Sequence, residues 1–136
     1  MRKSNINVVG LVLLMGCSNF MAPEGTLRMQ PPAEWKVWWN EAQPCINKEQ
    51  KRRWSEIEWY VTPGYVPFEG DSAAGLTHNN EIYISSYALE SGFPMELRRI
   101  VVHELVHAID KIHDHPYDPF EKCELMHGQY YKDPTP

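Results

Sequence analysis

Apolar residues in the second half of the chain recur with the spacing of one buried helix between Met95 and Lys111. Ser91 and Gly92 precede this segment, and Pro94 suits a first helical turn, where no amide hydrogen is needed. The apolar positions surround most of the helix, which is typical of a buried one. The exception is one narrow polar line: Glu96, Arg99, His103, His107 and Asp110. Such a line on a buried helix must meet specific partners.

Two shorter apolar runs predict β-strands. Ile57 to Val61 is β-branched and aromatic and is followed by a Pro-Gly turn, and Glu81 to Ser85 alternates two isoleucines with Tyr83. Residues 65–76 are interrupted by one proline and two glycines, and we expect them to be irregular. The His-Asn-Asn sequence at residues 78–80 predicts a turn before the second strand.

Three tryptophans predict an earlier helix over Glu34 to Gln43. Trp35, Trp38 and Trp39 have the spacing i, i+3, i+4, which places them on one helical face. We interpret this face as core packing; an aromatic platform for a ligand is the alternative. Pro44 is expected to end the helix. Residues 48–55 are polar and predict a solvated loop or a short helix.

These elements predict an α+β fold, with a small, mainly antiparallel sheet packed on the buried helix and a Trp-bearing helix near the start. The 136 residues leave room for one domain, which we place at residues 34–136. A hydrophobic core of this size gains stability from a cross-link such as a bound metal or a disulfide. The formal net charge of −5, without a basic stripe, argues against nucleic-acid binding.

The N-terminus has the pattern of an export signal. Arg2 and Lys3 precede an apolar run, residues 6–15, that is too short to span a bilayer. The run ends in Leu14-Met15-Gly16-Cys17, which resembles the bacterial lipobox. That resemblance implies that residues 1–16 are removed, that Cys17 is acylated, and that lipid anchors the protein at the bacterial cell envelope, in the outer membrane or at the cell surface. The alternative is a plain secretory signal.

Residues 17–33 contain three prolines and no apolar period, and we expect a flexible tether between lipid and domain. The chain has three cysteines, so lipidation of Cys17 leaves Cys45 and Cys123 as a pair. An oxidising compartment would let them form a disulfide. Closing so long a loop stabilises the fold by about 4 kcal/mol in the chain-entropy model. Two free buried thiols are the alternative.

The residues that predict chemistry are His103-Glu104-Leu105-Val106-His107, on the buried helix. The two histidines are one turn apart, so both imidazoles can bind one cation. Glu104 points about 100° around the helix and can act as general base toward a zinc-bound water, whose pKa the metal lowers toward 7. The structural alternative is a buried network in which the histidines pair with acids.

This motif resembles that of the zincin metallopeptidases, which add a third zinc ligand downstream. The segment from His103 to His113 is similar to the metzincin pattern, although that pattern has glycine where this chain has Asp110. His115-Pro116, followed by Phe120, is similar to the layout of minimal, SprT-like zincins. We favour His115 as the third ligand over His113. His127 is a further option.

The resemblance implies a zinc endopeptidase that acts on a peptide or protein at the cell envelope. It also implies that an edge strand beside the active helix binds the substrate, for which Glu81 to Ser85 is the natural counterpart. Asp110 is either a carboxylate that orients His107 or a solvated acid at the helix end. The alternatives in function are a non-catalytic zinc-binding or interaction lipoprotein and a zinc hydrolase with a non-peptide substrate. Four tyrosines could offer a hydroxyl to a tetrahedral intermediate: Tyr83, Tyr117, Tyr130 and Tyr131.

Overall fold

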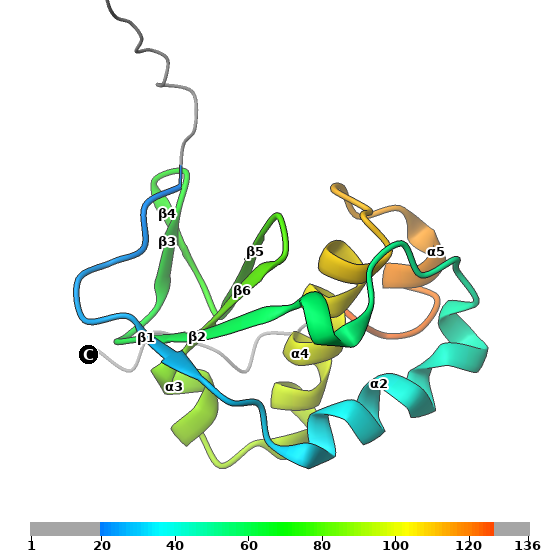
Figure 1. Ribbon diagram of the computed structural model, residues 1–136, viewed down its shortest axis with the longest axis horizontal. Helices are drawn as coiled ribbons and strands as arrows, with labels where there is room; N and C mark the ends of the chain where they lie inside the picture. The colour runs from blue at the N-terminus through cyan, green and yellow to red at the C-terminus, as the bar shows by residue number, and fades with distance from the viewer. Residues whose placement is uncertain (1–19, 127–136) are drawn as a thin grey trace, which may run out of the picture.

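The long helix predicted from the apolar spacing, α4 (Pro94–Ile109), lies at the centre of the computed structural model, which describes residues 20–126 (Figure 1). Pro94 occupies its first turn, as expected. The strands lie on one side of α4, and the helices α2 (Ala33–Ile46) and α5 (Tyr117–Phe120) lie on the other (Figure 1). Apolar side chains of α4 therefore meet protein on both sides, and most of its residues are buried.

The main sheet has four strands in the order β1-β2-β6-β5. They are β1 (Leu27–Met29), β2 (Glu58–Thr62), β5 (Gly75–His78) and β6 (Glu81–Ser85). β1 pairs with β2 and β5 pairs with β6 in antiparallel fashion, whereas β2 and β6 are parallel. The expected α+β class with a small, mainly antiparallel sheet is thus confirmed. β5 forms the edge of the sheet that lies nearest to α4.

The region expected to be irregular, residues 65–76, instead contains a hairpin. β3 (Val66–Phe68) pairs with β4 (Asp71–Ala73), and β5 follows directly. Glu69 and Gly70 form the two-residue loop, both with positive φ (50° and 80°), which is the geometry that favours glycine in tight hairpins. Pro67 is tolerated because a two-stranded sheet leaves its backbone at an edge. Gly70, one of the residues that suggested an interruption, is therefore part of the turn.

The Trp-bearing helix α2 is longer than predicted and continues through Pro44 to Ile46. Pro44 removes one hydrogen bond, but the Asn47 amide still donates to the Gln43 carbonyl (2.8 Å) and closes the last turn. Trp35 and Trp39 are almost fully buried in the core, and Trp38 packs against it. The interpretation of the tryptophan face as core packing is confirmed. After α2, the polar stretch contains a 3₁₀ turn, Trp54–Glu56.

The fold begins upstream of residue 34, within the segment expected to be a tether. Strand β1 completes the sheet by pairing with β2, and Thr26 Oγ1 lies 3.2 Å from Thr62 Oγ1. The Phe20 ring lies 4.8 Å from the Tyr83 ring, centroid to centroid. An unpaired edge of β2 would leave backbone groups unsatisfied, which explains the recruitment of this segment. The export signal and Cys17 lie outside the described residues.

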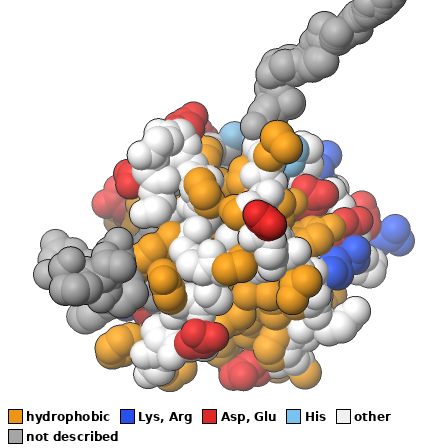
Figure 2. All heavy atoms as spheres, turned by 90° about the vertical axis from the view of Figure 1, so that its left-hand side faces the viewer, with side chains coloured by type: hydrophobic (Ala, Val, Ile, Leu, Met, Phe, Trp, Pro, Cys, Tyr) orange, Lys and Arg blue, Asp and Glu red, His pale blue; other side chains and the backbone are white. Residues whose placement is uncertain are grey.

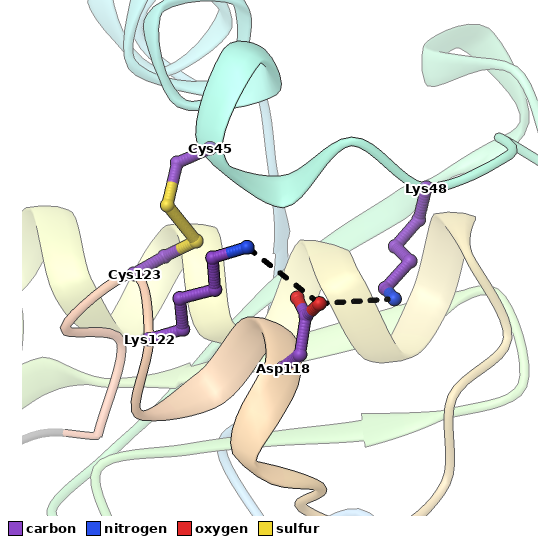
Figure 3. The surroundings of a disulfide bond; sticks show 5 residues. All are labelled: Cys45, Lys48, Asp118, Lys122 and Cys123. Atoms are coloured by element: carbon purple, nitrogen blue, oxygen red, sulfur yellow. Dashed lines mark ion pairs between the residues drawn. A yellow bond between two sulfur atoms is a disulfide. The ribbon is translucent and has the colours of Figure 1, made fainter.

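The disulfide predicted from the cysteine count is present. Cys45, in the last turn of α2, is bonded to Cys123, with 5.9 Å between the Cα atoms. The bond joins α2 to the segment that follows α5, 78 residues later (Figure 3). The expected pairing of Cys45 with Cys123 is therefore confirmed.

The strand side of the molecule carries scattered acidic side chains among apolar ones, with basic side chains gathered at one margin (Figure 2).

The short helix α3 (Ser86–Glu90) follows β6 and is capped by the Ser85 side chain, which accepts a hydrogen bond from the Tyr87 amide (3.1 Å). Across residues 20–126, no helix has the length and apolar character needed to cross a membrane.

Candidate metal centre

Three histidines converge at the C-terminal half of α4. His103 and His107 lie one turn apart on the helix, and His115 is brought back to them by the chain that follows. The His103 Nε2 atom lies 3.2 Å from that of His107 and 3.1 Å from that of His115, and the last two are 3.1 Å apart. These three residues, which we call the histidine triad, lie close enough to bind one metal ion. The preference for His115 over His113 agrees with this placement.

The turn that returns the chain is made one residue later than the metzincin pattern implies. Asp110 keeps a right-handed conformation (φ −88°), and Lys111 takes the left-handed one (φ 58°). The special backbone position is thus at Lys111, so glycine is not required at residue 110. His113, the ligand that the metzincin pattern implies, does not join the triad, because its side chain is exposed and lies at the rim of the triad cavity.

Two backbone carbonyls fix the ring orientation of the helical histidines. His103 Nδ1 donates to the Leu125 carbonyl (3.0 Å), and His107 Nδ1 donates to the Ile112 carbonyl. A carbonyl only accepts, so the proton of each neutral imidazole lies on Nδ1. The Nε2 lone pairs then point into the triad. Holding a ligand histidine through its other nitrogen is what metal sites in proteins commonly do.

This donor set fits a tetrahedral cation. A tetrahedral zinc with nitrogens at 2.0–2.1 Å has ligand atoms about 3.3–3.4 Å apart, slightly more than the spacing of the triad. Two lone pairs that face each other at 3.2 Å, as in His103 and His107, form no hydrogen bond and repel, whereas a shared cation binds both. Three neutral imidazoles suit zinc, copper, iron or nickel, so the residues alone leave the identity of the metal open.

The triad rests on an aromatic ring and is partly removed from water. The Phe120 ring centroid lies 4.9 Å from that of each of the three histidines. Burial lowers the pKa of His107, which favours the neutral form that a metal requires. Phe120 is fully buried and holds the short helix α5 to the core. His127 lies outside the described residues.

Glu104 borders the same cavity as the triad. Its carboxylate is buried, and Oε2 accepts a hydrogen bond from the Thr77 hydroxyl on β5 (2.8 Å). Burial raises the pKa of Glu104 to about 7, and the Thr77 hydrogen bond acts in the opposite direction. Gly75 makes this placement possible, because a Cβ there would lie 3.0 Å from the Glu104 Cγ and 2.9 Å from a methyl of Ile100.

The cavity, about 280 Å³ in volume, lies between α4 and β5 and has both polar and apolar walls. Gly75, Leu76 and Thr77 of β5 form one wall, and Phe68 and Met126 contribute apolar surface. The expectation that Glu81 to Ser85 is the substrate-binding edge strand is wrong. That segment is β6, which is paired on both sides, by β2 and by β5. Among residues 20–126, the sheet edge beside the triad belongs to β5.

Asp110 takes neither of the roles considered for it. It is not solvated, since only 2% of its surface is exposed, and His107 Nδ1 bonds Ile112 instead of Asp110. Neither carboxylate oxygen has a hydrogen-bond partner among the described residues. Burial raises the pKa of Asp110 to about 6, and the charges of Lys48 and Lys51 reduce the shift. Asp110 is thus a buried acid whose ionised form destabilises the fold.

We therefore expect Asp110→Asn to stabilise the protein at neutral pH. A raised pKa means that the folded state loses stability as pH rises from about 4 to about 6, and the loss persists above pH 6. Removing the charge should raise the free energy of unfolding at pH 7.5 by on the order of 2 kcal/mol. At pH 4 the two proteins should differ little. Urea titrations at both pH values measure this difference, and an equal effect of the substitution at both would contradict the assignment.

The structure also places residues that the sequence did not single out. Gly75 lies in the segment expected to be irregular, and Thr77 lies directly after it. The alternating Leu76-Thr77-His78 before an Asn-Asn turn is nevertheless a hairpin signal. No sequence signature marks the carbonyls of Ile112 and Leu125, because every residue has a backbone carbonyl. Tyr83 is buried away from the triad and donates to Glu81 (3.0 Å), and Tyr117 is exposed. Tyr130 and Tyr131 lie outside the described residues.

Comparison of the chain with family models, with curated proteins and with solved structures finds no match. The functional argument therefore rests on the residues of the candidate site themselves.

Proposed function

We propose that this protein is a zinc-dependent metallopeptidase, in which the histidine triad holds the metal and Glu104 is the general base. The observation that carries the proposal is the meeting of three Nε2 atoms, within 3.2 Å of one another, at a cavity that Glu104 also lines. A site that only binds metal needs the histidines alone. Three protein ligands leave a fourth position open, which is the arrangement of catalytic zinc sites.

Each residue then has a defined task. His103, His107 and His115 hold the ion through Nε2, and the Leu125 and Ile112 carbonyls keep two of the rings in the right orientation. When bound, zinc polarises a carbonyl group and lowers the pKa of a coordinated water. Thr77 holds Oε2 of Glu104, so we assign to Oε1 the acceptance of the proton from the attacking water. The same carboxyl can then deliver this proton to the leaving amine.

The outer edge of β5, which no other described strand pairs with, suits a substrate in extended conformation. An incoming peptide can pair with the β5 backbone as an additional strand, which would carry its carbonyl groups past the triad. Phe68 and Leu76 offer apolar surface to its side chains. We therefore propose a peptide or an unfolded protein segment as the substrate class.

The proposed activity is tested by hydrolysis of a mixed library of unstructured peptides by the full chain. We expect cleavage that stops when a chelator such as 1,10-phenanthroline removes the metal, and that returns when zinc is added back in slight excess. A non-chelating isomer of phenanthroline is the matched control and should leave the rate unchanged. Zinc binding without any cleavage would refute a peptidase.

A second candidate function, metal binding without hydrolysis, is favoured by one observation. The Thr77 hydroxyl bonds Glu104 within the interface of β5 and α4, where a carboxylate also has a structural use. In that case the proposed general base would only orient β5 against the helix. The behaviour of Glu104→Gln, described in the Discussion, separates the two candidates.

We further propose that the protein is anchored at the bacterial cell envelope through a lipid on Cys17. The support is the sequence Leu14-Met15-Gly16-Cys17 after a charged and apolar leader. Mass spectrometry of the membrane fraction should find an acylated N-terminal Cys17, and Cys17→Ser should release the protein or stall its processing. A wild-type protein that retains Met1 and stays in the soluble fraction would contradict this location.

A further inference from the structure

One short segment, residues 115–125, supplies three groups that contact the two helical histidines. It begins with the ligand His115, continues with Phe120 beneath all three rings, and ends with Leu125, whose carbonyl orients His103. Its internal hydrogen bonds tie these parts together. The Cys123 amide donates to the Pro119 carbonyl (2.9 Å), and the Leu125 amide donates to the Phe120 carbonyl (2.8 Å). Displacement of Cys123 would therefore shift Leu125 and Phe120 as well.

The segment has little regular structure of its own to fix it against α4. Its single helix, α5, covers only four residues. Besides the burial of Phe120 and Leu125 in the core, two links to α2 and the loop after it hold the segment (Figure 3). One is the disulfide between Cys45 and Cys123. The other is an ion contact, in which Asp118 Oδ2 lies 3.6 Å from Lys48 Nζ. Within the segment itself, the same oxygen lies 3.8 Å from Lys122 Nζ.

These links differ in strength. The Asp118 contacts are long and involve partly exposed side chains, so each contributes at most about 1 kcal/mol. The disulfide is covalent and is attached to α2, whose own position is fixed by the buried Trp35 and Trp39. Cys123 lies only two residues from the carbonyl that bonds His103. The disulfide is therefore the covalent restraint on that carbonyl, beside the burial of Phe120 and Leu125 in the core.

We propose that the Cys45–Cys123 disulfide is a positioning element of the metal centre, so that the affinity for the metal depends on the redox state of these two cysteines. The inference rests on the proposed metal site and adds its regulation. With the bond formed, the Leu125 carbonyl holds the His103 proton on Nδ1 and keeps Nε2 for the metal. With the bond broken, residues 121–125 lose their covalent attachment, and His103 loses the fixed orientation that binding requires.

Reduction of the disulfide allows the bonded and the broken state of the same protein to be compared. A trialkylphosphine breaks the S–S bond: each Sγ leaves as a thiol with one proton, and phosphorus takes the oxygen of one water to become the phosphine oxide. Such a reductant binds zinc weakly, unlike a dithiol. The Cys45→Ser, Cys123→Ser double variant reproduces the broken bond without creating thiols that could themselves bind zinc.

The experiment measures zinc affinity of the full chain by competition with a chromophoric chelator. Relative to the oxidised wild type, we expect affinity to fall about 10- to 100-fold in the double variant and in the reduced wild type, the range found when a group supporting a metal ligand is lost. The phosphine should have no further effect on the double variant. Lys48→Met, which removes one ion contact and keeps the disulfide, should change affinity less than about threefold.

Two further measurements separate positioning from general loss of stability. Ile57→Ala opens a cavity in the core at a residue that does not line the triad cavity, and it should lower the melting temperature without a comparable loss of affinity. Nitrogen-15 spectra of the metal-free protein should show His103 with its proton on Nδ1 when oxidised, and a mixture of tautomers when reduced.

The outcomes are distinct. Equal zinc affinity in the oxidised and reduced wild type would overturn the positioning role and leave the proposed peptidase intact. A loss in Ile57→Ala as large as that in the double variant would also overturn it. Failure of the oxidised wild type to bind zinc would instead overturn the metal centre on which the proposed function depends.

Discussion

Replacement of His115 by alanine is expected to reduce zinc affinity by at least about 100-fold, whereas replacement of His113 should leave affinity nearly unchanged. One residue separates the two histidines in the sequence, and both are exposed. The two alanine variants have the same composition, so their intrinsic properties hardly differ. What distinguishes them is geometry. Only His115 places its Nε2 atom 3.1 Å from those of His103 and His107. With two ligands left, the ion loses a third of its protein donors.

The measurement is a chelator competition on both variants, together with their melting temperatures without metal. His115→Ala should melt near the wild-type temperature when metal-free, because its exposed side chain contributes little to the core. Zinc should stabilise the wild type and His113→Ala, and it should stabilise His115→Ala far less. If His113→Ala lost zinc and His115→Ala retained it, the triad would be wrongly assigned.

Glu104→Gln is expected to keep zinc and to lose hydrolysis, with the turnover rate falling roughly 10²- to 10⁴-fold. Glutamine has nearly the shape of glutamate and can accept the Thr77 hydrogen bond through its amide oxygen. It cannot accept a proton from water at neutral pH. Because Glu104 is buried, removing its charge should also leave the fold as stable as before or more stable.

The matched control is Thr77→Val, which removes the hydroxyl that holds Glu104 and keeps the carboxylate. We expect it to lower the rate much less than Glu104→Gln, because the proton acceptor remains. Zinc content and the melting temperature, measured on both variants, exclude a trivial loss of metal or fold. Full activity of Glu104→Gln would disprove the general-base role, and a destabilised, metal-bound variant would favour the structural use of Glu104.

The sequence predicted well those elements whose signal is local. The segment Glu81 to Ser85 forms a strand with the observed bounds, and α4 differs from its prediction by one residue at the start and two at the end. Both segments have a clear apolar period, and burial of their apolar side chains stabilises the element that this period predicts. The histidine pair on α4 follows from the same period. The disulfide followed from counting cysteines, since the lipobox resemblance left only one pair.

The failures involve tertiary context. Gly70 and Pro67 suggested an interruption, but they build a hairpin because pairing with β4 decides their role. Leu27 to Met29 has no apolar period of its own. It becomes a strand because it pairs with the edge of β2, whose backbone groups would otherwise lack hydrogen bonds. The edge strand was misplaced because strand order cannot be read from one strand. Asp110 lies on the polar line of α4. Its burial without a hydrogen-bond partner among the described residues depends on the loop that passes the helix end, where the Lys51 amide donates to the Ile109 carbonyl.

The most direct test of the central claim is zinc K-edge absorption spectroscopy on the wild-type protein, with metal content measured on the same sample. The proposed centre predicts one zinc per chain, three imidazole nitrogens at about 2.0–2.1 Å, and one further light ligand. The same measurement on His115→Ala should show the loss of one imidazole. A wild-type protein with negligible zinc after incubation and dialysis, or a zinc bound by sulfur, would contradict the histidine triad as a metal centre.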